Sequence, residues 1–219
     1  MPVLPPAGAK QPAGRADKKK GTDSMSYLAD KILQEGLILP NNVLKIDSFL
    51  NQQIDPTVMK AIEEEFYAYF QNHGISKVLT IEASGIAPAI MVAAHFDVPM
   101  LFAKKALPST LQKDAYYQTQ VHSYTKNTTY QVLVSKQYLS PADRVLIIDD
   151  FLANGDAAMG LVDLVAQAGA TVAGVGICVE KSFQPGRERL ERAGLDVYAS
   201  VRIAAIDSER QTISFAPGH

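Results

Sequence analysis

The chain has 219 residues, of which 47% are hydrophobic and 20% are charged, so it can bury a sizeable core and fits one globular domain. Its formal net charge of -2 gives no general reason to bind nucleic acid or an anionic membrane. It contains neither a continuous apolar stretch of roughly 18 residues nor the apolar core of a secretory signal, and we expect a cytoplasmic protein with no membrane partner.

The N-terminal segment differs in composition from the rest of the chain. Residues 1–24 mix Pro, Gly, Ala and Lys without any apolar period, which predicts a disordered tail. Met25 directly precedes the first helical pattern, so we expect residues 25–219 to form a single domain.

Helix-like and strand-like segments then alternate along the chain. Val58, Ile62, Phe66 and Phe70 stand four residues apart and predict an amphipathic helix within residues 56–74. The other expected elements are a strand at 78–81, a helix at 86–96, a strand at 99–103, a polar, Tyr-rich and poorly patterned stretch at 106–128, a strand at 145–148, a helix at 156–168 and a strand at 171–179.

This alternation predicts an α/β fold. Continuous apolar strands separated by helices indicate a mainly parallel sheet covered on both faces. Ligands bind such sheets at the carboxyl ends of the strands, so the residues just after each strand are the best candidates for a site.

The most informative strand end lies at residues 145–158. Asp149 and Asp150 follow four apolar residues, and a short loop from Ala153 to Ala157 then opens a helix. The carboxylates can accept hydrogen bonds from a sugar diol, and loop amides at a helix N-terminus can bind a phosphate. The alternative is an ordinary strand-loop-helix junction with two solvated acids.

This segment resembles the phosphoribosyl pyrophosphate motif of type I phosphoribosyltransferases, and the resemblance extends over residues 25 to 216. It implies the fold of that family, a twisted, mainly parallel sheet flanked by helices with a small base-binding hood. It also implies that Asp149 and Asp150 hold the ribose hydroxyls. The loop that binds the 5-phosphate would then consist of Ala153, Asn154, Gly155, Asp156 and Ala157.

Asp156 departs from the family pattern, because it adds a carboxylate near the expected phosphate. A helix N-terminus favours a carboxylate, whereas a bound phosphate repels it. We therefore expect the Asp156 side chain to face solvent or the first-turn amides, with the phosphate held mainly by backbone N–H groups and Asn154.

The resemblance covers three further segments around the expected donor site. Ser84 and Gly85 open a helix where the family has its pyrophosphate loop, although a plain strand-to-helix turn would look similar. Lys104 and Lys105 resemble the cations that contact pyrophosphate, although paired lysines are more often solvated. The stretch 106–128, with Ser123-Tyr124, has the position of the flexible catalytic loop, which would exclude water from the reacting centre; it could instead be an exposed insertion.

The base-recognition features resemble those of the bacterial xanthine branch of this family. The resemblance implies that Leu44 packs on the purine and that Asn51 bonds its edge, both within a hood at residues 43–56. It places a base-contacting lysine, Lys181, after the last core strand, and Phe183 could add an aromatic face. Without the resemblance, Leu44 would be a core residue and Lys181 a surface charge.

The implied activity is transfer of the phosphoribosyl group of phosphoribosyl pyrophosphate (PRPP) to xanthine. The resemblance also implies a homodimer, and Mg2+ bound through PRPP rather than by a dedicated protein site. Two alternatives stay open, namely a transferase for adenine, hypoxanthine or guanine and a non-catalytic PRPP-sensing purine regulator. The regulator is disfavoured because no helix-turn-helix pattern precedes the fold and the chain is not basic, so no nucleic-acid partner is expected.

Overall fold

The computed structural model describes residues 26–105, 113–123 and 128–216. The predicted tail at 1–24 lies outside these ranges, as do residues 106–112 and Tyr124 of the expected catalytic loop. No helix within the described ranges has the length and apolar character needed to cross a bilayer.

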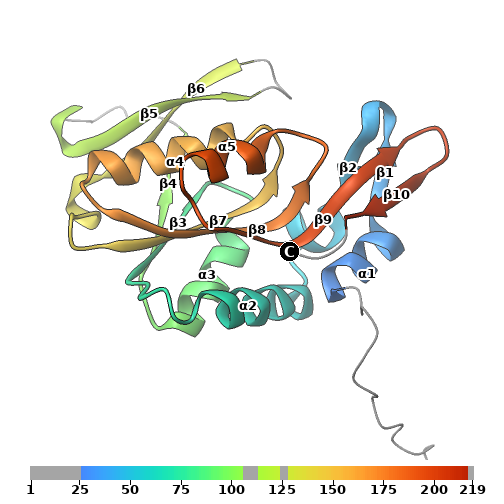
Figure 1. The fold of residues 1–219 in the computed structure, drawn as a ribbon, viewed down its shortest axis with the longest axis horizontal. Coiled ribbons are helices and arrows are strands. Elements are labelled where there is room, and N and C mark those ends of the chain that lie inside the picture. Colours follow the sequence, from blue (N-terminus) through green and yellow to red (C-terminus); the bar gives the residue numbers. More distant parts are fainter. Residues whose placement is uncertain (1–25, 106–112, 124–127, 217–219) are drawn as a thin grey trace, which may run out of the picture.

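A six-stranded sheet forms the centre of the domain, with strand order β10-β9-β8-β7-β3-β4 (Figure 1). All neighbouring strands pair in parallel except β10, which pairs antiparallel with β9. This confirms the predicted mainly parallel sheet. The strands are β3 (Lys77–Ile81), β4 (Met100–Ala103), β7 (Arg144–Leu152), β8 (Thr171–Lys181), β9 (Val197–Asp207) and β10 (Thr212–Phe215).

Helices cover both faces of this sheet. Figure 1 shows α2 (Pro56–Phe70) and α3 (Ile86–Phe96) on one face, and α4 (Asp156–Gln167) and α5 (Gly186–Arg192) on the other. The Asp55 carboxylate caps α2 by accepting a hydrogen bond from the Thr57 amide at 2.8 Å. The predicted apolar stripe of α2 is fully buried, which confirms its helical periodicity.

A separate hairpin corrects the expectation for residues 106–128. Strands β5 (Tyr116–Ser123) and β6 (Thr128–Ser135) pair antiparallel and lie beyond α4 in Figure 1. The prediction of an irregular stretch is therefore wrong for residues 116–123. We call this hairpin the arm. Thr119 and Val121 lie two positions apart on β5 and both pack next to Gly160 of α4. A Cβ atom at Gly160 would lie 2.5 Å from Val121 Cγ2. Aromatic and hydroxyl residues obscure this period of two in the sequence.

Two central strands also differ from their predicted extents. β7 continues to Leu152 and therefore includes both acids, whereas the sequence predicted its end at Ile148. β8 is not the last core strand, because β9 pairs in parallel along its outer edge. Polar residues such as Ser200 and Arg202 interrupt the apolar pattern of β9, which explains why the strand was missed.

The N-terminal elements lie together at one end of the sheet and include residues 43–56, where the hood was predicted. Helix α1 (Tyr27–Glu35) precedes a small hairpin of β1 (Leu37–Leu39) and β2 (Val43–Lys45), and a π-helical turn follows at Asp47–Asn51. Short 3-10 turns occupy Pro40–Asn42, Lys113–Ala115 and Lys136–Tyr138. Figure 1 shows α1 and the β1-β2 hairpin beside the ends of β9 and β10.

Candidate active site

Two buried carboxylates lie near the carboxyl end of β7. Asp149 is 4% exposed and Asp150 is 8% exposed, so the alternative of two solvated acids is wrong. The Asp150 amide donates a hydrogen bond of 3.0 Å to Asp149 Oδ1. Burial raises the pKa of Asp149 well above its usual value, and the charge of Asp150 raises it further. Buried acids with few donors around them are suited to receive hydroxyl groups or a cation.

The turn at Gly85 lies directly against this acid pair. A Cβ atom at Gly85 would lie 3.3 Å from Asp149 Oδ1 and 2.1 Å from Thr80 Oγ1. Thr80 is fully buried, and its hydroxyl has no hydrogen-bond partner among the described residues. Ser84 is half-buried in the same turn, which ends where α3 begins. The structure therefore brings the candidate pyrophosphate turn and the two acids to one end of the sheet.

The candidate phosphate loop connects β7 to α4. Gly155 has φ +84°, a left-handed conformation that favours glycine, and its carbonyl accepts the Met159 amide at 2.9 Å. Gly155 is the N-cap residue of α4, and as a glycine it has no side chain that could cap the helix. The loop lines a pocket with about 570 Å³ of empty space that opens to solvent. The loop's amides and the N-terminus of α4 can serve an anion there.

The sequence predicts that the Asp156 side chain faces solvent or the first-turn amides, and the structure shows that this is wrong. Its Oδ1 pairs with Arg189 Nη1 of α5 at 2.9 Å, and the same nitrogen donates to the Asn154 carbonyl at 2.6 Å. The reason is the docking of α5 against the loop, where the Gly186 amide donates to the Ala153 carbonyl at 3.0 Å. Sequence reasoning missed Arg189, because a contact between residues 33 positions apart leaves no local signal.

The two lysines after β4 have different surroundings. The backbone of Lys104 pairs with Leu133 of β6, and its ammonium lies 5.9 Å from the Phe102 ring centroid. The Lys105 amide donates to Glu82 Oε1 at 2.7 Å, and its charge partly opposes the rise in the pKa of Asp149. Of the two lysines, Lys105 is therefore the one whose charge acts on Asp149.

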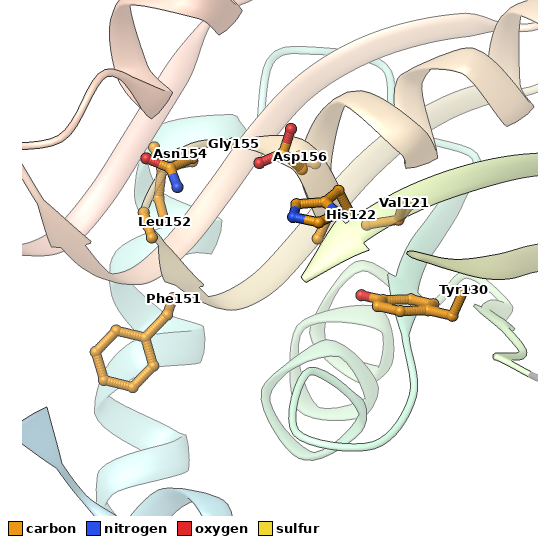
Figure 2. Close-up of a pocket in the computed structure, with 11 residues that line it drawn as sticks. Val121, His122, Tyr130, Phe151, Leu152, Asn154, Gly155 and Asp156 are labelled. Atoms are coloured by element: carbon orange, nitrogen blue, oxygen red, sulfur yellow. The ribbon is translucent and has the colours of Figure 1, made fainter. Parts of the chain in front are cut away.

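Residues of the arm face the phosphate loop across the pocket. Figure 2 shows His122 of β5 near Asp156, and Tyr130 of β6 with its hydroxyl directed toward the pocket. Burial raises the pKa of Tyr130, and the charges of Asp149 and Asp156 raise it further. Sequence reasoning did not select either residue, since His122 lies in the stretch expected to be irregular and Tyr130 belonged to no predicted element.

The candidate base-contacting residues lie at the end of β8 and just after it. Lys181 Nζ is 5.6 Å from the ring centroid of Phe151, and burial lowers the pKa of Lys181. Phe183 is 46% exposed. Phe151 also lines the pocket, and its aromatic side chain two positions after Asp149 was the signal that could have identified it.

A buried ion pair holds the turn that carries these residues. Glu180 is 1% exposed, and its Oε2 lies 2.6 Å from Arg187 Nη2 and 2.7 Å from Arg187 Nε. Its other oxygen accepts the Ser182 hydroxyl at 2.6 Å. These contacts link both ends of the turn, so they fix the segment that contains Lys181 and Phe183.

The two hood residues differ in their environment. Leu44 is 5% exposed and belongs to the hydrophobic core next to α1. Asn51 is half-buried, and its Oδ1 has no hydrogen-bond partner within the described ranges. A buried amide oxygen without a partner is costly unless a ligand or water satisfies it.

Comparisons with known proteins were made by sequence and by structure. No protein-family model matches the chain. Xanthine phosphoribosyltransferases of Staphylococcus aureus strains JH9 and Newman are each 56% identical to it over 189 residues, which cover 86% of this chain and 98% of theirs.

Solved structures that resemble this chain include adenine phosphoribosyltransferases. The Giardia lamblia enzyme has a TM-score of 0.67 at 22% identity and covers 82% of this chain and 98% of its own. The Rhodothermus marinus enzyme has a TM-score of 0.65 at 24% identity, with 80% and 98% covered. At these identities the likeness establishes the type I phosphoribosyltransferase fold alone.

Proposed function

The chain belongs to the xanthine phosphoribosyltransferase family, and we propose that its strand-end site transfers the 5-phosphoribosyl group of PRPP to xanthine in purine salvage. The products are xanthosine 5'-monophosphate and pyrophosphate. The observation that carries the proposal is the buried Asp149–Asp150 pair next to Gly85, on the strand that leads into the phosphate loop.

PRPP would bind across the carboxyl ends of β3 and β7. Asp149 and Asp150 would accept hydrogen bonds from the ribose hydroxyls, a role supported by their burial and by the scarcity of competing donors around them. The 5-phosphate would bind at Ala153–Ala157, where the left-handed Gly155 turns the chain into the N-terminus of α4.

The pyrophosphate group would lie between one segment that supplies backbone amides and another that supplies positive charge. Ser84 and Gly85 would contribute backbone N–H groups, because the absence of a Cβ at Gly85 leaves room beside Asp149. Lys104 and Lys105 would supply positive charge. The charge of Lys105 also acts on Asp149, where it lowers the pKa. These charges favour departure of the diphosphate as negative charge develops on it.

Xanthine would bind between the turn after β8 and the hood. Lys181 would face the second oxo group or the anionic base, and Phe183 and Phe151 would offer aromatic surfaces. The unpartnered amide oxygen of Asn51 supports its role at the purine edge. Leu44 would act from within the core by supporting the hood.

The reaction displaces pyrophosphate from C1 of the ribose by a purine nitrogen and needs no covalent protein nucleophile. The protein would align the two substrates and exclude water. Alignment lowers the barrier because the substrates lose their translational and rotational entropy on binding and not in the chemical step. Mg2+ would neutralise charge on the diphosphate when it is bound. Among the described residues no group of three or more His, Cys, Asp and Glu could hold a metal. Asp149 and Asp150 are the buried carboxylates that would lie beside an ion carried by PRPP.

We extend the proposal to the assembly and location of the protein. A homodimer in the cytoplasm follows from the resemblance, and light scattering of the full chain would measure the assembly directly. A monomer at micromolar concentration would contradict the homodimer without touching the activity.

The activity is tested by measuring base-dependent pyrophosphate release from PRPP with xanthine, hypoxanthine, guanine and adenine. Xanthine should give the highest kcat/KM, because an ammonium and an amide favour two oxo groups over an exocyclic amine. A preference for another base would replace the substrate assignment. PRPP binding without turnover on any base would contradict the enzyme and favour a sensor.

A further inference from the structure

One guanidinium from outside the phosphate loop contacts two of its residues. Arg189 Nη1 lies 2.9 Å from Asp156 Oδ1 and 2.6 Å from the Asn154 carbonyl oxygen. The Asp156 side chain is 21% exposed and that of Arg189 is 40% exposed, so solvent screens the pair only in part. Asn154 and Asp156 both line the pocket that the loop forms.

Asp156 creates a charge problem for the binding of a dianionic 5-phosphate. The residue is the first of α4, where the helix N-terminus attracts anions, and its carboxylate would compete with the phosphate for that positive potential. It would also repel the phosphate directly. An unpaired carboxylate at this position therefore weakens the loop as an anion site.

The docking of α5 onto the loop places the compensating charge. A Cβ atom at Gly155 would lie 3.1 Å from Gly186 Cα, and the Gly186 amide donates to the Ala153 carbonyl at 3.0 Å. Two glycines thus allow the backbones of the loop and of α5 to come into contact. Arg189 follows Gly186 by one turn of α5 and so reaches the loop.

We propose that Arg189 is a positioning residue that makes the phosphate loop usable by cancelling the charge of Asp156. The proposal rests on the proposed function, since it assumes that the 5-phosphate of PRPP binds at this loop. Arg189 does not contact the reacting atoms. It determines the affinity for the phosphate end of the donor and not the affinity for the base.

The proposal predicts an order of affinities from the net charge of the pair. The pair is neutral in the wild type, negative in Arg189→Ala, positive in Asp156→Asn and neutral again in the double variant. The KM for PRPP should therefore be lowest in Asp156→Asn, similar in the wild type and the double variant, and highest in Arg189→Ala, by about tenfold over the wild type. Arg189→Lys should recover part of the loss.

The experiment measures the KM for PRPP, the KM for xanthine and the melting temperature of these five proteins and of the control Arg192→Ala, at low and at high salt. Arg192→Ala is the matched control, because Arg192 lies on the same helix and pairs with Glu188 instead of the loop. The KM for xanthine should stay within about twofold throughout, and the differences in the KM for PRPP should shrink at high salt.

Each other result has a defined meaning. If Arg189→Ala leaves the KM for PRPP unchanged, or if Asp156→Asn in the double variant fails to restore it, the proposal is overturned. If Arg189→Ala fails to fold, comparison of Asp156→Asn with the wild type decides, because an unchanged or raised KM for PRPP contradicts charge cancellation. A wild-type protein without PRPP-dependent turnover would instead refute the proposed function itself.

Discussion

Gly85 lies so near Asp149 that a Cβ atom at residue 85 would crowd the carboxylate, so the turn before α3 and the acid pair of β7 depend on each other. A Cβ atom at Gly85 would lie 3.3 Å from Asp149 Oδ1, a separation tighter than most real contacts, and 2.1 Å from Thr80 Oγ1, which no real structure tolerates. Any side chain at residue 85 must therefore displace Thr80 or the turn, and it crowds the Asp149 carboxylate.

Gly85→Ala should reduce PRPP binding more than it reduces stability. The added methyl group moves the Asp149 carboxylate and the turn amides out of register, and a displacement of about 1 Å at a reacting centre can cost roughly 100-fold in rate. Steady-state kinetics with varied PRPP, together with thermal melting, would measure both effects. The matched control is Gly194→Ala, since a Cβ atom there meets nothing within 4 Å, although its φ of +75° predicts some loss of stability. Equal kinetic effects of the two substitutions would contradict the contact.

The affinity for PRPP should fall as the pH is lowered below neutrality. The pKa of Asp149 is raised by burial and by the charge of Asp150, so the free protein takes up a proton there at a higher pH than an ordinary aspartate does. Ribose hydroxyls bind the carboxylate form, so donor binding must release that proton. The linked loss is at most about tenfold in affinity per pH unit.

Asp149→Asn isolates this dependence, because the 5-phosphate of PRPP titrates equally with both proteins. The variant should bind PRPP more weakly at neutral pH but with a shallower pH profile than the wild type. Parallel profiles in isothermal titration between about pH 5 and 8 would mean that Asp149 does not titrate in the binding step.

Lys181→Ala should lower the kcat/KM for xanthine more than that for hypoxanthine. Only the second oxo group or the anionic form of the base gains strongly from the ammonium, and a charged hydrogen bond is worth about 1–3 kcal/mol. Paired progress curves with the two bases give the difference directly. Identical losses would assign Lys181 to general positioning of the turn after β8, in company with the buried Glu180–Arg187 pair.

Glu65→Gln should stabilise the fold at neutral and alkaline pH. Burial raises the pKa of Glu65, and a hydrogen bond from the Ser200 hydroxyl at 2.5 Å offsets only part of that rise. A raised carboxyl pKa means that ionisation disfavours the folded state, so the stability present below the unfolded pKa is lost as the pH rises through the folded value. The gain in melting temperature over the wild type should therefore vanish in acid.

Glu64→Gln is the control for this prediction, because Glu64 adjoins Glu65 and has an exposed side chain paired with Lys60. It should change the melting temperature little at any pH. A stabilisation of the same size in both variants, or one that persists at about pH 3, would show that the pKa of Glu65 is not the cause.

Much of the parallel sheet was predictable, because its strands are continuous apolar runs and its helices have clear periods. The helix at 86–96 has the predicted bounds, and the helix from Pro56 differs only at its end. The arm and β9 were missed for one physical reason. In both, Tyr, Thr, Ser or Arg occupies positions that alternate across a strand, and such residues hide a period of two.

The site was predictable to the extent that it is local in sequence. Asp149, Asp150 and the loop after them form one continuous motif, and Gly85 opens a helix after a strand. Arg189 and Tyr130 reach the loop from other elements, so their positions depend on how α5 and the arm pack. The ion pair of Asp156 could not be foreseen for the same reason, since its partner lies on α5.

The central claim is that the acid pair of β7 holds PRPP for transfer to xanthine. The most direct test is the rate of xanthosine 5'-monophosphate formation by the wild type and by Asp149→Asn, Asp150→Asn and their double variant, with folding checked by circular dichroism. We expect the wild type to form the nucleotide and pyrophosphate in equal amounts, and the double variant to lose roughly 100-fold or more in kcat/KM for PRPP while it stays folded. Turnover at the wild-type rate by all three variants would contradict the assignment.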